Sequence, residues 1–291
     1  MLILQILLSG LAQGCIYGLV ALGFVLIYKA TETINFAQGE LMMLGAFLIW
    51  VLVDVMKLHF VLAVVMGILL MGALGWLLER MLLRPILGQP AFSVIMLTFG
   101  LGYMARGAIT MIPGVGTETH TLSLPYRNVM LRPGGLVLPA EQLVVIAATI
   151  ALVALLYLMF RFTRVGIAMQ AASQNQIAAY YMGIAVKRLN GLVWAMAAAV
   201  ATLAGLLLAP FTFVHVGMGF IGLKAFPAAV IGGFGSLPGA IVGGLVIGLI
   251  ESFAGFYLPE GFKDVAAYVV VLIVLWVKPN GLFGESVRKK V

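Results

Sequence analysis

The chain has 291 residues, of which 63% are hydrophobic and only 9% are charged, and its formal net charge is +7. Because soluble domains carry about 25% charged residues, this composition excludes a soluble domain and indicates a polytopic membrane protein. The basic residues gather in loops and at the C-terminal end, so the charge reports orientation in a membrane and gives no reason to expect nucleic-acid binding.

Apolar runs long enough to cross a bilayer, which takes about 20 helical residues, follow one another along the chain. They predict an all-α fold with about eight or nine transmembrane helices, in one transmembrane domain that covers residues 1–291. The first run is too long for the apolar region of a cleavable signal, about 7–15 residues, and no basic region precedes it. The predicted spans are residues 2–28, 36–56, 60–83, 91–112, 141–160, 189–211, 222–258 and 264–278.

A polar stretch, residues 34–40 (INFAQGE), lies at the start of the second predicted span. Polar groups at membrane depth are costly, so Asn35, Gln38 and Glu40 are candidates to line a translocation pathway. Gly39 permits a helix interruption or a close helix approach. The alternative is an ordinary interfacial helix start, in which Asn35 caps the helix and Glu40 lies near its positive end.

Charge in the loops predicts the topology. Arg80 and Arg84 mark a cytoplasmic end after the third span, whereas residues 113–140, with four prolines, form a long external loop. The basic loop 161–188 and the basic C-terminal tail then lie in the cytoplasm. An N-terminus outside and a C-terminus inside require an odd number of crossings.

The loop 161–188 contains Arg161, Arg164, Lys187 and Arg188 and no acidic residue. Its sequence predicts two short helices, the second of which is capped by the side chain of Asn175 and ends at Gly183, a residue suited to the left-handed position after a helix. Two short helices on the cytoplasmic side would make a docking surface. The alternative is a short interfacial connector without a partner.

The long apolar segment 222–258 exceeds one crossing and must be broken, and residues 235–239 (GSLPG) are the predicted break. Two pieces follow, either two crossings or a re-entrant half-helix and one full crossing; the parity argument favours two crossings. Broken helices often form substrate sites in transporters, so four residues around the break are pathway candidates. The alternative, which is compatible with the first, is a tight helix-packing seam. These candidates are Lys224, Gly232, Gly233 and Gly235.

Four stretches resemble a known family. In the basic loop, Ile177-Ala178-Ala179-x-x-x-Gly183 has the spacing of the "EAA" loop of ABC-importer permeases, with Ile177 in place of the family's Glu. Residues 34–40 and 222–240 resemble segments of branched-chain amino-acid permease subunits of the LivH type, and sugar (ribose-type) permeases have a segment similar to the second. Pro227 stands where the family commonly has Ala. The tail 278–284 (KPNGLFG) is similar to the family's ending.

The resemblance implies a permease subunit of an ABC importer in the bacterial inner membrane. Asn175, Ala178, Ala179 and Gly183 would then couple the chain to ATPase subunits. The implied partners are a second related permease, two cytoplasmic ATPases and an external substrate-binding protein. The implied substrate is a branched-chain or other hydrophobic amino acid, with urea, short amides or aromatic acids as alternatives.

The chain carries no sign of catalysis. It lacks a P-loop, so ATP would be bound by the partner subunits, and no cofactor or metal is expected on this chain. Its three histidines have no ligand spacing, and Cys15 is expected to pack in an apolar span. Structural roles are expected for the remaining charged residues in or beside spans, which are Glu79, Arg80, Arg106 and Glu251.

The second hypothesis for the function is a stand-alone secondary transporter or channel, which would use Glu40 and Glu251 as its titratable groups.

Overall fold

The computed structural model describes residues 2–86, 88–131, 138–259 and 261–284. Over these residues the chain is a bundle of helices with one two-stranded antiparallel sheet, in which β1 (Met130–Leu131) pairs with β2 (Leu138–Pro139). Seven helices of the described part are long and apolar enough to cross a membrane. The prediction of an all-α fold is confirmed.

The long helices agree closely with the predicted spans. In α2 and α3 the helical path continues as wider π-helical turns, over Val51–Val55 and Glu79–Leu83, before it ends. The helices are α1 (Leu2–Thr31), α2 (Gln38–Trp50), α3 (Phe60–Leu78), α4 (Ala91–Thr110), α5 (Ala140–Phe162), α6 (Arg164–Gln174), α7 (Gln176–Tyr181), α8 (Val186–Thr212), α9 (Ile221–Gly232), α10 (Leu237–Tyr257) and α11 (Phe262–Val277).

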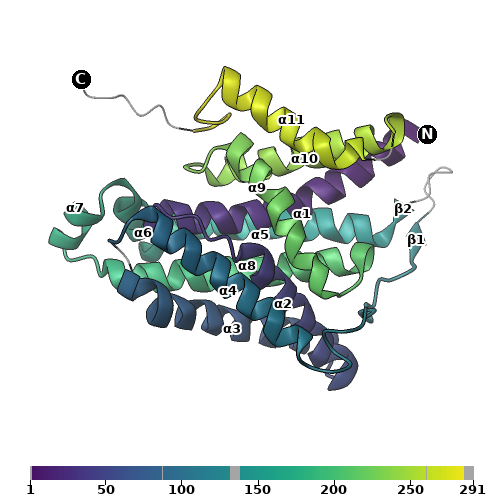
Figure 1. Cartoon of the computed structure of the whole chain (residues 1–291), viewed down its shortest axis with the longest axis horizontal. Helices are drawn as coiled ribbons and strands as arrows, with labels where there is room; N and C mark the ends of the chain where they lie inside the picture. The colour runs from purple at the N-terminus through teal and green to yellow at the C-terminus, as the bar shows by residue number, and fades with distance from the viewer. Residues whose placement is uncertain (1, 87, 132–137, 260, 285–291) are drawn as a thin grey trace.

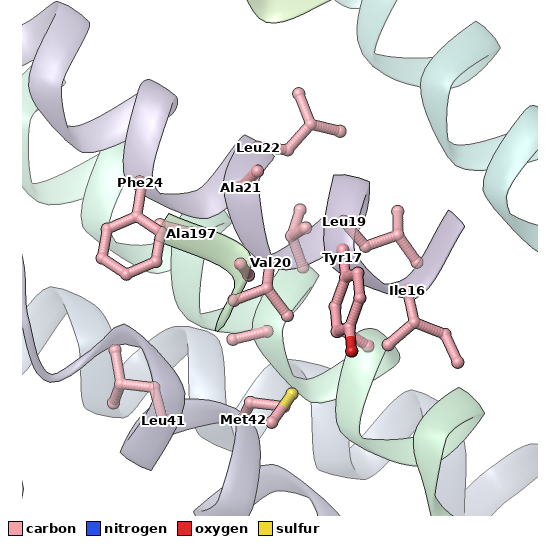
Figure 2. Packing of buried hydrophobic residues seen from close by; sticks show 14 of the residues in the cluster. Ile16, Tyr17, Leu19, Val20, Ala21, Leu22, Phe24, Leu41, Met42 and Ala197 are labelled. Atoms are coloured by element: carbon pink, nitrogen blue, oxygen red, sulfur yellow. The ribbon is translucent and has the colours of Figure 1, made fainter. Parts of the chain in front are cut away.

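Helix α1 forms the centre of the bundle, with most of its length buried between α8, α9, α10 and α5. Its side chains pack beside Leu41 and Met42 of α2 and Ala197 of α8 (Figure 2). Several of the positions at which it meets α10 are glycines. A Cβ atom on Gly248 would overlap the backbone of Gly14, so the two helices meet backbone to backbone. Such close approach is how small residues stabilise helix pairs in lipid, where no hydrophobic effect drives association.

The predicted break of the segment 222–258 is confirmed: α9 ends at Gly232, and α10 begins at Leu237 with Ser236 as its cap, whose Oγ accepts a hydrogen bond from the Gly239 amide at 3.1 Å. Pro227, the departure from the family pattern, lies inside α9 without ending it. A short 3₁₀ turn, Val216–Phe220, leads into α9.

The C-terminal tail closes over this break. The backbone amides of Leu282 and Phe283 donate to the carbonyl groups of Ile231 (2.7 Å) and Gly232 (3.2 Å), which are the last two of α9. Gly233 and Gly281 both have positive φ, +92° and +79°, and their backbones are in contact. The two glycine-rich motifs that the sequence places about fifty residues apart are therefore one structural unit, in which the tail satisfies carbonyl groups that a helix end leaves unpaired.

Contacts between helix termini show which termini lie at the same end of the bundle. Gln176 Nε2 donates to the Ala30 carbonyl at the end of α1 (2.7 Å), and the Tyr28 and Phe234 rings lie 5.0 Å apart. The loop α6–α7, the end of α1 and the break before α10 are thus together, and the N-terminus, β1 and β2 lie at the opposite end (Figure 1). We call these the loop end and the strand end.

The two pieces of the broken segment, α9 and α10, can be placed relative to these two ends. Before the 3₁₀ turn that leads into α9, Val214 pairs with His120 of the long loop, whereas α9 finishes at the loop end. The chain from Val214 to Gly232 thus passes from the strand end to the loop end, although α9 itself begins beside Gly39 inside the bundle. Helix α10, which runs antiparallel to α1, passes back to the strand end. This supports the two crossings favoured by parity. The tail residues Arg288, Lys289 and Lys290 lie outside the described residues.

Candidate functional site

The loop α6–α7 has the local structure that its sequence predicts. The Thr163 hydroxyl caps α6 by accepting from the Gly166 amide (3.0 Å), and Asn175 Oδ1 caps α7 by accepting from the Ala178 amide (2.9 Å). Gly183 follows α7 with φ +82°, a conformation in which a Cβ atom would be strained. The caps and the glycine fix where α7 begins and ends.

Helix α7 presents an apolar face to the outside of this chain. Ala179 is turned inward and buried, and Gln176 ties the helix to the end of α1. The large side chains of this face have exposed fractions between 69% and 83%. They form what we call the α7 surface: Ile177, Tyr180, Tyr181 and Met182.

The segment that precedes α2 returns into the bundle. The amide of Phe36 donates to Thr98 Oγ1 of α4 (3.2 Å), and Gln38 Nε2 donates to the Ala197 carbonyl of α8 (3.1 Å). Ala197 lies eleven residues beyond the start of α8 at Val186, about 16 Å at 1.5 Å per residue. Helix α2 therefore begins inside the bundle. Of the alternative interpretation, the cap by Asn35 is wrong, whereas Glu40 does lie in the first turn of α2, near its positive end.

Asn35 and Gln38 are fully buried and bonded within the protein. The Asn35 side chain accepts from the Ala37 amide (3.1 Å) and does not cap α2, which has no side-chain cap. The Gln38 amide fills the space above Gly23, where a Cβ atom would overlap it. These two residues hold the start of α2 in place, as buried polar groups with hydrogen-bond partners do.

Glu40, two residues farther along, pairs with Arg106 of α4 at 2.6 Å, Oε1 to Nη2. The Arg106 guanidinium lies over the Phe220 ring at 3.9 Å from its centroid, and the Phe36 and Phe99 rings stack at 4.5 Å nearby. Both charged side chains keep about one-sixth of their surface accessible, at 15% and 17%. The charged pair Glu40–Arg106 thus lies at the wall of a small aromatic pocket on the face formed by α2, α4 and the turn before α9.

The structure separates the predicted pathway residues into two groups. Asn35, Gln38, Gly39 and Glu40 lie together, and Gly39 packs against the backbone of Gly222 beside them. Lys224 is half-buried on α9. The remaining three lie at the loop end. The tail covers Gly232 and Gly233, and Gly235 lines a cavity of about 560 Å³.

The sequence does not reveal the partner of Glu40. A structural role is expected for Arg106, whose only local signal is a charge inside an apolar span, and its partner Glu40 lies 66 residues away. Glu251 is fully buried in α10 and accepts a hydrogen bond from Tyr17 (2.5 Å), and Glu79 pairs with Arg84 at 2.7 Å. Among the described residues no group of three or more His, Cys, Asp or Glu side chains could hold a metal ion.

Comparisons with known proteins extend over nearly the whole chain. The family described as "Branched-chain amino acid transport system / permease component" matches residues 6–275. The high-affinity branched-chain amino-acid permease LivH of Escherichia coli is 30% identical, over 99% of this chain and 97% of the relative. The permease BraD of Pseudomonas aeruginosa is 29% identical, over 99% and 98%.

One solved structure also resembles this chain. It is PsaBC from Streptococcus pneumoniae in complex with Fab, with a TM-score of 0.51 over 94% of this chain and 92% of that chain. Its sequence identity is 14%, so the likeness concerns the fold alone.

Proposed function

The chain belongs to the branched-chain amino-acid transport permease family, and from this premise we propose that it translocates branched-chain or other hydrophobic amino acids across the bacterial inner membrane. As an ABC-importer permease of this family it is a multi-pass, non-catalytic membrane subunit, and ATP is bound by partner ATPases. The resemblance to LivH-type permeases is confirmed.

The α7 surface is the observation that carries the coupling part of the proposal. Four large apolar side chains, three on the short helix α7 and one directly after it, stand exposed at the loop end. Exposed apolar patches mark interaction sites. Asn175 and Gly183 set the limits of that helix, while Ala178 and Ala179 form its body. We assign this surface to the ATPase, and the whole of residues 1–291 to one permease domain.

Orientation follows from charge. The loop that carries the α7 surface has four basic residues and no acidic one, and such loops face the cytoplasm. The strand end, with the N-terminus and the long loop, then faces outward. A binding protein would deliver substrate there.

Transport would proceed by alternating access. The ATPases adopt different states with and without ATP, and differential contact with the α7 surface favours one permease conformation over the other. Since α7 is bonded to the end of α1 through Gln176 and Ala30, a displacement of α7 would reach the central helix of the bundle. We propose an importer with a second related permease, two ATPases and an external binding protein.

Substrate uptake by the reconstituted importer tests the proposal. Proteoliposomes that contain the chain, its permease and ATPase partners and the cognate binding protein are expected to accumulate leucine, isoleucine or valine only when ATP is present inside. Accumulation of urea, short amides or aromatic acids would instead support the alternative substrates. Gradient-driven uptake by this chain without any ATPase would contradict the proposal in favour of a secondary transporter.

A further inference from the structure

The charged pair Glu40–Arg106 joins α2 to α4 inside the bundle and lines the small aromatic pocket. Arg106 is four residues before the end of α4 at Thr110, about 6 Å along the helix axis, and α4 ends at the strand end. The pair opens onto a face that the described residues of this chain leave uncovered, with Tyr103 and Phe220 exposed at 70% and 54%. A charged pair at this depth is costly and is a functional candidate by default.

Two features of the pair prepare it for a ligand. Arg106 uses Nη2 for Glu40, but its Nε is buried and has no hydrogen-bond partner among the described residues. A guanidinium offers Nε and an Nη together as a fork that matches a carboxylate. Glycines surround the pair: a Cβ atom on Gly219 would lie 3.0 Å from Arg106 Nη2, and one on Gly102 would lie 3.2 Å from Glu40 Cδ.

We propose that Glu40 and Arg106 bind the two charges of a zwitterionic amino acid during translocation, a deepening of the proposed function on which this inference rests. The substrate carboxylate pairs with the Arg106 fork and its ammonium group with Glu40. The rings of Phe36, Phe99 and Phe220 contact its apolar side chain. One internal ion pair is exchanged for two with the substrate, and the total charge of the site remains zero.

This exchange selects among the candidate substrates. Urea and short amides have no opposite charges to offer to a separated pair, so they cannot replace the Glu40–Arg106 contact. An aromatic acid pairs with Arg106 but leaves the Glu40 carboxylate without a cation. A zwitterion compensates both groups, which favours amino acids over the alternatives that the family resemblance leaves open.

The structure shows the pair closed. Glu40 Oε1 and Arg106 Nη2 are 2.6 Å apart, and the pocket beside them has a volume of only about 40 Å³. Substrate binding therefore requires Glu40 and Arg106 to separate, so the pair closes the pathway in one conformation and binds substrate in another.

Replacement of both charges tests the inference. Ion pairs replaced by apolar residues of similar size leave folding intact or improve it, so the variant Glu40→Met, Arg106→Met is expected to assemble with its partners. We expect its ATP-driven leucine uptake per assembled complex to fall by about tenfold or more. ATPase stimulation by the loaded binding protein is expected to persist, since the α7 surface is unchanged.

A matched control removes a second ion pair, Glu79–Arg84, which has nearly the same length and lies at the loop end, where Arg84 also donates to the Lys187 carbonyl. The variant Glu79→Met, Arg84→Met is expected to keep uptake within about threefold, a cost within the usual effect of single structural changes. Equal uptake by the Glu40/Arg106 variant and the unaltered importer would overturn the inference, as would an equal loss in both variants.

Two further outcomes, failure of the variant to assemble and absence of uptake by the unaltered importer, are also decisive. If the double methionine variant fails to assemble, the variant Glu40→Gln, Arg106→Gln, which keeps polar side chains without charge, decides: uptake within threefold of the unaltered importer overturns the inference, and a tenfold loss supports it. If the unaltered importer accumulates no amino acid, the proposed function itself fails, and that result is distinct because it precedes any substitution.

Discussion

A permease with Tyr181→Asp and Met182→Asp is expected to lose its ATPase partners while remaining folded. Both side chains are more than 80% exposed and belong to the α7 surface, so the folded chain loses little by the change. In the complex, two carboxylates would be buried in an apolar interface. Hot-spot residues of an interface cost about 2 kcal/mol or more when they are lost, and with the two most exposed side chains of the α7 surface in that role, binding should weaken by about thirtyfold or more.

Co-purification of the ATPase with the tagged permease measures this effect. The matched control is Ser173→Asp with Gln174→Asp, which adds the same two charges to the same loop at the end of α6, outside the α7 surface. The control is expected to retain the ATPase. Equal retention by both variants would show that the α7 surface is not the docking site.

The substitution Gly248→Leu is expected to prevent the bundle from folding. A Cβ atom at this position would overlap Gly14 and lie 2.6 Å from the Gly10 carbonyl oxygen. Overpacking usually costs about 1–3 kcal/mol, and more where it cannot be relieved. Here the obstacle is backbone, which no change of rotamer moves, and α1 is the central helix of the bundle.

The yield of monodisperse protein after extraction in detergent checks this expectation. The control is Gly100→Leu on α4, where the space around the missing Cβ is open within 4 Å. We expect the control to retain most of the normal yield and Gly248→Leu to retain almost none. Similar yields for the two variants would mean that the contact between α1 and α10 is not required for folding.

Most of the fold could be predicted because membrane spans are local features of sequence. Length and hydropathy alone give the helices, and Gly235 to Gly239 give the break. The caps at Asn175 and Gly183 depend on residues within one turn of each other. For the segment 222–258, only the odd number of crossings that the charge distribution requires favours two crossings over a re-entrant piece. The contacts of Val214 and Phe234 at opposite ends of the bundle support two crossings.

The site was less predictable because its members meet across long sequence separations. Arg106 lies 66 residues from Glu40, and nothing local to α4 indicates that its charge turns toward α2. The tail at Gly281 lies over Gly233, so residues selected for a pathway prove to be covered by the chain's own backbone. Asn35 was a natural candidate for a cap, but the segment before α2 returns into the bundle, and its side chain serves the Ala37 amide instead.

The sidedness of the α7 surface is the most direct test of the coupling scheme. In a chain with Cys15 replaced by Ala, a cysteine at Met182 and, separately, one at Thr117 of the long loop are treated with a membrane-impermeant thiol reagent; both positions are exposed. We expect Thr117→Cys to react in intact cells and Met182→Cys only after the membrane is opened. Reaction of Met182→Cys in intact cells would place the α7 surface outside, away from any cytoplasmic ATPase, and would contradict the scheme.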